Sequence, residues 1–265
     1  MPVTRLAFPG KTNAELPDME ASISGHVALV TGGVRGIGLA ISERLAAAGV
    51  TVAAGYSKPS EASERFLASH GGSGATIHQG NIGRNEDCER VVGEVLERHG
   101  RLDILVNNAG VTLDRTVRKM TAEEWDHVLQ VNLHGTFYMC RAVLSHMIDR
   151  GYGRIVNISS IVGEIGAIGQ ANYAASKAGL FGLTMSLARE CANKGITVNT
   201  VAPGFIRTEM VEAVPEEALA KVVGRIPCGR LGEADEVARV VEFLVDPASS
   251  YITGDAYSIN GGLAM

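Results

Sequence analysis

The sequence predicts a single α/β domain in which about seven parallel strands form a doubly wound sheet with helices on both faces. Three observations favour this fold class. Short apolar, β-rich runs alternate with stretches of helical length, the runs are apolar throughout, and neither an internal repeat nor a Pro/Ser-rich linker divides the chain after residue 25. Continuous apolar strands are typical of parallel sheets buried on both faces, because right-handed crossovers place helices on each side.

The expected elements follow one another from about residue 25, so residues 25–265 are expected to form the domain. Residues 1–24, with Pro2, Pro9 and Pro17, are expected to form an N-terminal arm that could be flexible. The expected strands are Val27–Val30, Val52–Gly55, Ala75–His78, Ile104–Val106, Arg154–Ile158, Thr197–Val201 and Ala256–Ile259. The expected helices are Gly36–Ala48, Glu61–Ser69, Asn85–Arg98, Ala122–Ile148, Tyr173–Asn193 and Ala234–Val245.

Composition excludes several classes of protein. The 265 residues carry 24 Lys and Arg against 29 Asp and Glu, a formal charge of −5, which argues against a nucleic-acid partner. With 46% hydrophobic residues the chain is neither disordered nor a disulfide scaffold. Four scattered cysteines without CxxC spacing predict no metal site and a cytoplasmic location, and no apolar run is long enough to predict a membrane span.

A glycine loop follows the first expected strand. The segment Thr31–Gly38 reads TGGVRGIG, with Gly32, Gly36 and Gly38 spaced as GxxxGxG before a helix. Glycines allow positive φ and close approach of a phosphate, and the N–H groups at a helix start favour its charge. The loop therefore predicts a dinucleotide pyrophosphate site, although three glycines alone could equally form a plain turn.

The end of the second strand indicates which dinucleotide is preferred. It reads Gly55-Tyr-Ser-Lys58 and lacks the acidic residue that would accept hydrogen bonds from an adenosine ribose. Ser57, Lys58 and Arg35 could instead hold a 2′-phosphate through charge-assisted hydrogen bonds. We therefore expect NADP(H) to be preferred, with NAD(H) not excluded; both basic residues could also be ordinary surface charges.

Hydroxyl groups and a lysine form a candidate catalytic set. Tyr173 and Lys177 are four residues apart on an expected helix and so share one face. A nearby cation lowers the pKa of a phenol from its usual value near ~10. Ser160 follows the fifth strand, where ligands bind in open α/β sheets, although serines there also cap turns.

Taken together, these motifs resemble the classical short-chain dehydrogenase/reductase family, which has a Rossmann-like fold. The resemblance covers nearly everything from residue 25 onward. It is carried, in family order, by Thr31–Gly38, Asn107–Gly110 (NNAG), Asn132, Ser160, Tyr173, Lys177 and Pro203-Gly204.

The resemblance implies a role for each matching residue. Tyr173 would be the general acid/base, Ser160 would hydrogen-bond the reacting oxygen, Lys177 would bind the nicotinamide ribose and lower the tyrosine pKa, and Asn132 would hold a water that relays protons. Further cofactor contacts are implied for Gly32, Arg35, Gly36, Ile37, Gly38, Ser57, Lys58, Asn81, Ile82, Asn107, Ala109, Gly110, Pro203, Gly204, Ile206 and Thr208. Asn81 stands where the family commonly has Asp.

Within the family, the chain is most similar to reductases of 3-oxoacyl thioesters, of both the acyl-carrier-protein and the acetoacetyl-CoA types. The segments Thr112–Met120, Gly169–Asn172 and Ser258–Leu263 carry this similarity, which does not separate the two carriers. Arg115, Arg118 and Lys119 could meet a phosphate or an acidic carrier, or simply be solvated.

The resemblance also implies a homotetramer built on the long helices and the C-terminal strands. The variable segment Glu209–Arg230 would form a substrate lid, in which the apolar residues Met210, Val211, Val214 and Leu219 would either face a substrate or pack the core of a short helix. Two rival functions stay open: a dehydrogenase of another secondary alcohol, such as a steroid or polyol, and a cofactor-binding regulator without catalysis.

Overall fold

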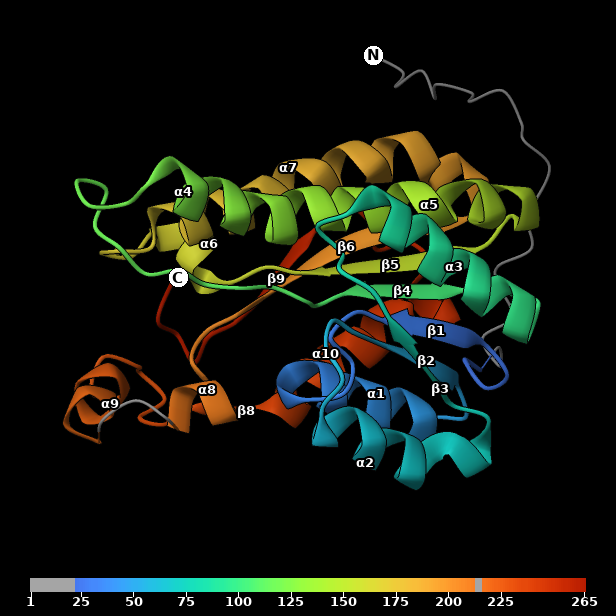
Figure 1. Ribbon diagram of the computed structural model, residues 1–265, viewed down its shortest axis with the longest axis horizontal. Coiled ribbons are helices and arrows are strands. Elements are labelled where there is room, and N and C mark those ends of the chain that lie inside the picture. Colours follow the sequence, from blue (N-terminus) through green and yellow to red (C-terminus); the bar gives the residue numbers. More distant parts are fainter. Residues whose placement is uncertain (1–21, 213–215) are drawn as a thin grey trace, which may run out of the picture.

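The computed structural model describes residues 22–212 and 216–265, and it confirms the doubly wound α/β architecture (Figure 1). Seven parallel strands form the central sheet in the order β3-β2-β1-β4-β5-β6-β9. Their bounds are β1 Val27–Val30, β2 Thr51–Tyr56, β3 Thr76–Gln79, β4 Ile104–Asn107, β5 Gly153–Ile158, β6 Ile196–Pro203 and β9 Ala256–Ile259. The strand order reverses between β1 and β4, so the carboxyl edge there is the expected ligand position.

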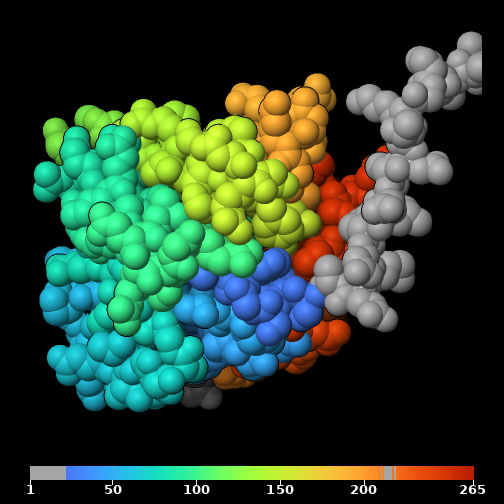
Figure 2. Space-filling view, turned by 90° about the vertical axis from the view of Figure 1, so that its right-hand side faces the viewer, coloured from blue at the N-terminus to red at the C-terminus, as the bar shows by residue number. Residues whose placement is uncertain are grey.

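Helices cover both faces of this sheet. One face carries α1 (Gly36–Ala47), α2 (Glu61–His70) and α10 (Ala234–Val245), and the other carries α3 (Asn85–His99), α4 (Ala122–Leu129), α5 (Gly135–Arg150) and α7 (Ala171–Cys191). In the side view the yellow-green α5 and orange α7 stand above the blue β1 region, and the cyan α2 lies below it (Figure 2).

Alternate residues of each strand enter opposite cores, which explains why the strands are apolar throughout. In β1, Ala28 and Val30 pack with α1 and α10, whereas Val27 and Leu29 pack with α3 and α5. Both sets are buried, since successive side chains of a strand point to opposite faces.

One expected helix, Ala122–Ile148, is interrupted. After α4 the backbone makes a π-helical turn over Gln130–His134 before α5 begins at Gly135. Apolar periodicity predicted the helical stretch, but it does not distinguish a π-helical turn from a regular α-helical one. Single π-helical turns of this kind are frequent at functional sites.

Several short elements lie beyond the strand ends and were not expected from the sequence. They are α6 (Ile161–Ile165), α8 (Glu209–Glu212), α9 (Glu216–Val223) and the parallel pair β7 (Ile206–Arg207) and β8 (Gly232–Glu233). Of the expected lid residues, Val214 lies outside the described residues, as does most of the expected arm 1–24.

Residues 22–212 and 216–265 contain neither a candidate membrane span nor a cluster of metal ligands. No helix there combines the length and apolar character that a membrane span requires. No three His, Cys, Asp or Glu side chains in this part of the chain gather as metal ligands would, and its four cysteines form no disulfide.

Candidate active site

A glycine cradle links β1 to α1 at the carboxyl edge of the sheet. Gly32 and Gly36 have φ values of +65° and +53°, which L side chains rarely adopt. A Cβ on Gly38 would overlap the Gly32 carbonyl and stand 2.5 Å from Asn108 Nδ2. Arg35 precedes the helix without a side-chain cap, so the first N–H groups of α1 can bind an anion. The cradle fits a dinucleotide pyrophosphate.

Two polar residues that the sequence analysis did not single out hold this cradle against the NNAG loop. The Thr31 hydroxyl accepts hydrogen bonds from the backbone N–H groups of Asn108 and Ala109, both at 3.0 Å. Asn108 Nδ2 donates to the Thr31 carbonyl at 2.9 Å. Their positions directly after β1 and β4 were the available signal, because parallel strands end at one edge.

The segment after β6 forms the opposite wall. Gly204 donates its N–H to the Ile259 carbonyl at 2.8 Å, which fixes the turn after Pro203. Ile206 is buried, and the Thr208 methyl group lies 3.7 Å from where a Cβ on Gly36 would stand. Of the expected cofactor contacts in this segment, Thr208 therefore faces the glycine cradle.

Lys177 and Tyr173 lie on one face of α7, as their spacing predicted. The Lys177 ammonium lies 5.7 Å from the Tyr173 ring centroid and donates a 2.7 Å hydrogen bond to the Ile158 carbonyl. Lys177 is only 4% exposed, and this burial lowers the pKa of its ammonium group to about 8. Because this pKa still lies above 7, Lys177 is mostly a cation at neutral pH, and its ammonium group is hydrogen-bonded to the Ile158 carbonyl.

The pKa of Tyr173 differs in direction from the sequence expectation. Burial raises it above its ordinary value, and the charge of Asp114 raises it further, whereas hydrogen bonding with Ser160 lowers it. Lys177 is not among the groups that shift this pKa, and desolvation of the phenol is the largest effect. Tyr173 is consequently a protonated phenol at neutral pH, which suits a proton donor.

Ser160 occupies the end of β5 and performs the capping role that was its alternative interpretation. Its hydroxyl oxygen accepts the backbone N–H of Val162 at 3.1 Å and so caps α6. The same hydroxyl influences the Tyr173 phenol by hydrogen bonding. The capping serine therefore lies close enough to Tyr173 to lower the pKa of its phenol.

Asn132 lies in the π-helical turn, fully buried. Its amide oxygen accepts the Val111 N–H at 2.8 Å, and its Nδ2 donates to the Val111 carbonyl and the Ser176 hydroxyl. A Cβ on Gly110 would stand 3.2 Å from Asn132 Oδ1 and 3.4 Å from Lys177 Nζ. The π turn therefore brings Asn132 to the NNAG loop beside Lys177.

Asn107 is placed differently from its neighbours in the NNAG loop. Its side chain is buried between sheet and helices, where Nδ2 donates to Asn157 Oδ1 at 2.9 Å and to Cys140 Sγ. Contact between Asn107 and a dinucleotide would involve its main chain, whereas Gly110 is exposed at the cleft.

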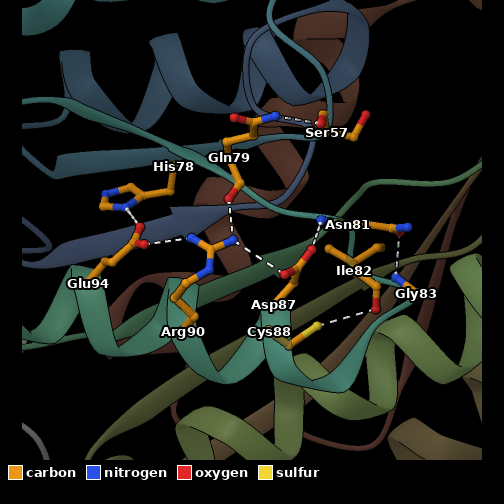
Figure 3. A network of polar contacts seen from close by, with 10 residues as sticks. All are labelled: Ser57, His78, Gln79, Asn81, Ile82, Gly83, Asp87, Cys88, Arg90 and Glu94. Carbon is orange, nitrogen blue, oxygen red and sulfur yellow. Dashed lines mark hydrogen bonds and ion pairs between the residues drawn. The ribbon is translucent and has the colours of Figure 1, made fainter.

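The other end of the cleft lies at the tips of β2 and β3. Arg35, Ser57 and Lys58 are exposed there, on the glycine loop and directly after β2. Asn81 and Ile82 follow β3, and Asn81 lines a cavity of about 450 Å³ together with Ser57 (Figure 3). This cavity suits the adenosine end of a dinucleotide that extends from the glycine cradle.

A second cavity, of about 570 Å³, lies on the Ser160 side of the site, where α6, α9 and the C-terminal segment meet. Its lining is mostly apolar, with Arg225 as its one basic residue. The lining residues are Ile161, Val162, Ile165, Gly166, Ala167, Ile168, Phe205, Val222, Arg225 and Leu263. Most of these residues were not predicted to line a site, because α6 is too short to carry a periodic apolar pattern.

Comparisons with known proteins agree with this geometry. A family model described as enoyl-(acyl carrier protein) reductase matches residues 32–264. An acetoacetyl-CoA reductase of Shinella zoogloeoides is 50% identical over 238 residues, 89% of this chain and 98% of that protein. A 3-oxoacyl-[acyl-carrier-protein] reductase, FabG of Escherichia coli, is 43% identical over 244 residues, 92% of this chain and 99% of that protein. With its glycine cradle, doubly wound sheet and these relatives, the chain belongs to the short-chain dehydrogenase/reductase family of NAD(P)(H)-using oxidoreductases.

Proposed function

We propose that this chain reduces a 3-oxoacyl thioester, carried on coenzyme A or on an acyl carrier protein, to the 3-hydroxyacyl thioester with NADPH. The observation that carries the proposal is the convergence of Ser160, Tyr173 and Lys177 beside the glycine cradle, in a chain half identical to an acetoacetyl-CoA reductase.

The proposed chemistry divides between the nicotinamide and the protein. Bound NADPH supplies a hydride to the C3 carbon of the substrate. The protonated Tyr173 phenol donates its proton to the C3 oxygen, and the Ser160 hydroxyl donates a hydrogen bond to the same oxygen as its charge develops. Lys177 binds the nicotinamide ribose hydroxyls, and Asn132 holds a water from which a proton returns to the site.

The preference for NADPH rests on charge at the adenosine end. Arg35 and Lys58 are exposed cations, and Ser57 provides a hydroxyl, at the position where an acidic residue would favour NADH. Guanidinium and ammonium groups form charge-assisted hydrogen bonds with a phosphate. We propose that these three residues hold the 2′-phosphate, so that NADH is used less well.

The apolar cavity beside Ser160 suits the acyl end of a thioester, because its lining is mostly apolar and favours a hydrocarbon chain over the many hydroxyl groups of a polyol. Of the basic residues proposed to meet the carrier, Arg115 is paired with Glu124 at 3.1 Å. Arg118 and Lys119 therefore offer the more available charges.

We also propose that the protein is a cytoplasmic homotetramer.

The test is consumption of NADPH with acetoacetyl-CoA, measured by absorbance beside NADH and beside a 3-oxoacyl carrier-protein substrate. We expect turnover that prefers NADPH and that Tyr173→Phe lowers by about 10²- to 10⁴-fold without abolishing NADPH binding. Crotonyl-CoA serves as the enoyl control. Turnover of crotonyl-CoA alone would replace the proposal with enoyl reduction, and binding of NADPH without turnover of any carbonyl would favour a regulator.

A further inference from the structure

The loop from Gly80 to Arg84, at the tip of β3, is held at almost every backbone group. Gly80 donates its N–H to the Tyr56 carbonyl at 2.9 Å, and the Gly83 carbonyl accepts from Gln130 Nε2 at 2.7 Å. Between them, the Ile82 carbonyl accepts the Cys88 thiol. This loop carries Asn81, which the family resemblance gives as a cofactor contact and which we place at the adenosine end.

The Asn81 side chain is oriented by the same loop. Its Oδ1 accepts the Gly83 N–H at 3.0 Å, as Figure 3 shows. Since a backbone N–H can only donate, this bond identifies the oxygen end of the amide and leaves Nδ2 as a donor for a ligand. Asn81 lines the cavity of about 450 Å³ together with Asp87 and Arg90, so a small shift of the loop would move this donor relative to a purine bound there.

One carboxylate ties Asn81 to helix α3. Asp87 Oδ2 accepts the Asn81 backbone N–H at 2.8 Å, and Asp87 Oδ1 lies 3.5 Å from the Arg90 guanidinium. The hydrogen bond from Asn81 lowers the pKa of Asp87, which keeps the group ionised. Asp87 therefore fixes the residue that bears the ligand-facing amide.

Arg90 and Glu94 extend this tie along the same face of α3 and back to β3 (Figure 3). Arg90 donates to the Gln79 carbonyl at 2.8 Å and to Glu94 Oε1 at 2.6 Å. Glu94 Oε2 in turn lies 3.0 Å from Nδ1 of the buried His78. The chain of contacts from Asp87 to His78 holds the strand end, the loop and the helix in one arrangement.

We propose that Asp87 is a positioning residue for the purine end of the dinucleotide, acting through the backbone of Asn81. This inference rests on the proposed use of a nicotinamide dinucleotide. Asp87 is assigned no contact with the reacting atoms, so its removal weakens cofactor binding more than it slows the chemical step.

The test measures binding of NADPH and of adenosine 2′,5′-bisphosphate, which represents the purine end alone, by titration calorimetry. Asp87→Ala is expected to raise the Kd of both ligands by about tenfold, the effect of losing one hydrogen bond to a charged group. The KM for NADPH rises with it, and kcat changes less. Asp87→Asn restores most of the affinity, because an amide oxygen still accepts the Asn81 N–H.

The matched control is Glu86→Ala, which removes an exposed carboxylate from the same first turn of α3. It should bind both ligands like the wild type. Equal Kd values for Asp87→Ala and Glu86→Ala would overturn the inference. If Asp87→Ala does not fold, Arg90→Gln replaces it and is expected to raise the same two Kd values; unchanged values would again overturn the inference. A wild-type chain that binds neither NADPH nor NADH would instead contradict the proposed function itself.

Discussion

In the proposed reaction, the half-buried Tyr173 and the buried Lys177 determine whether the site can donate a proton at neutral pH. Burial raises the pKa of the Tyr173 phenol, and burial lowers the pKa of the Lys177 ammonium to about 8. Desolvation disfavours the charged form in both cases, so the directions are opposite for an acid and a base. Near pH 7 both groups carry their protons, which is the state needed for carbonyl reduction.

The pH dependence of reduction follows from these directions. Lys177 is charged below a pH of about 8 and loses its charge above it, whereas Tyr173 remains protonated throughout that range. We expect kcat/KM for NADPH to be level up to a pH of about 8 and then to fall by up to about tenfold per pH unit. In Lys177→Arg the side chain stays charged, so the fall should move to higher pH. If the pH profile of Lys177→Arg were the same as that of the wild type, the fall in kcat/KM would come from another group than Lys177.

A single methyl group at Gly38 should disrupt the cradle. Its Cβ would stand 2.5 Å from Asn108 Nδ2 and would meet the Gly32 backbone, which cannot move aside cheaply. Overpacking of this kind costs about 1–3 kcal/mol, so Gly38→Ala should lower the melting temperature and weaken NADPH binding. Gly93→Ala, in α3 with open space around it, should keep the melting temperature or raise it. Equal behaviour of the two variants would contradict the close approach.

For single residues, the sequence predicted where side chains lie when their spacing matches a helical turn or the end of a strand. Tyr173 and Lys177 share a helix face because four residues make about one turn, and Ser160 follows a strand that ends at the carboxyl edge. The direction of the tyrosine pKa was predicted incorrectly, because burial depends on tertiary packing. Thr31 and Asn108 were named only as parts of motifs, and Asp87 was missed, since the role of each depends on hydrogen bonds with backbone groups that residue types alone do not reveal.

At the scale of the secondary-structure element, the π-helical turn between α4 and α5 is the feature that joins the NNAG loop to α7. Asn132 in this turn bonds both polar groups of Val111 and the hydroxyl of Ser176. A widened turn moves the buried asparagine relative to a regular helix, and the next turn is held by a bond from the Thr136 hydroxyl to the Asn132 carbonyl. One amide therefore connects three segments of the site.

Removal of that amide should destabilise the protein as well as the reaction. Asn132→Ala leaves the Val111 N–H and carbonyl without their partner, and unsatisfied buried groups cost roughly 1–3 kcal/mol each. We expect a clear loss in the free energy of unfolding, measured by urea denaturation, together with a lower kcat. Asn193→Ala, at an exposed position after α7, is the control and should change neither. A stable Asn132→Ala would show that the loop holds its shape without the amide.

Helices and strands were predictable from the sequence where their burial requires a regular pattern of apolar residues. Strands Val27–Val30 and Ala256–Ile259 and helix Ala234–Val245 have the expected bounds. The pair β7 and β8 was missed because two-residue strands carry no alternation, and its partners Ile206 and Gly232 are far apart in the chain. The π turn was missed because the apolar pattern on either side of it is helical.

At the scale of the whole molecule, the reversal of strand order between β1 and β4 explains how distant segments meet in one site. The crossovers after β1 and β4 leave on opposite faces, toward α1 and toward α4, and the glycine cradle and the NNAG loop meet at the sheet edge between them. The polar cavity lies at the tip of β3, and the apolar cavity lies beside α6, at the end of β5. An extended dinucleotide and a thioester can therefore meet at Tyr173.

If the chain assembles as the proposed homotetramer, two exposed apolar side chains mark candidate interfaces on separate faces. Met185 of α7 is 51% exposed and Phe243 of α10 is 50% exposed, on helices that cover opposite faces of the sheet. A homotetramer with two kinds of twofold interface would bury both, and would have a mass of about 110 kDa, four times that of one chain. Light scattering after size exclusion should find this mass for the wild type, and a fully active monomer would contradict it.

Charged substitutions can assign each face to an interface. We expect Met185→Glu and Phe243→Glu each to yield a dimer, because a buried unpaired carboxylate is costly and each substitution affects only one kind of contact. Leu67→Glu, on α2, alters an apolar side chain of similar exposure, 43%, outside both expected interfaces, and should leave the tetramer intact. If Leu67→Glu dissociates the assembly and Phe243→Glu does not, then the helices flanking β2, rather than the C-terminal elements, form the second interface.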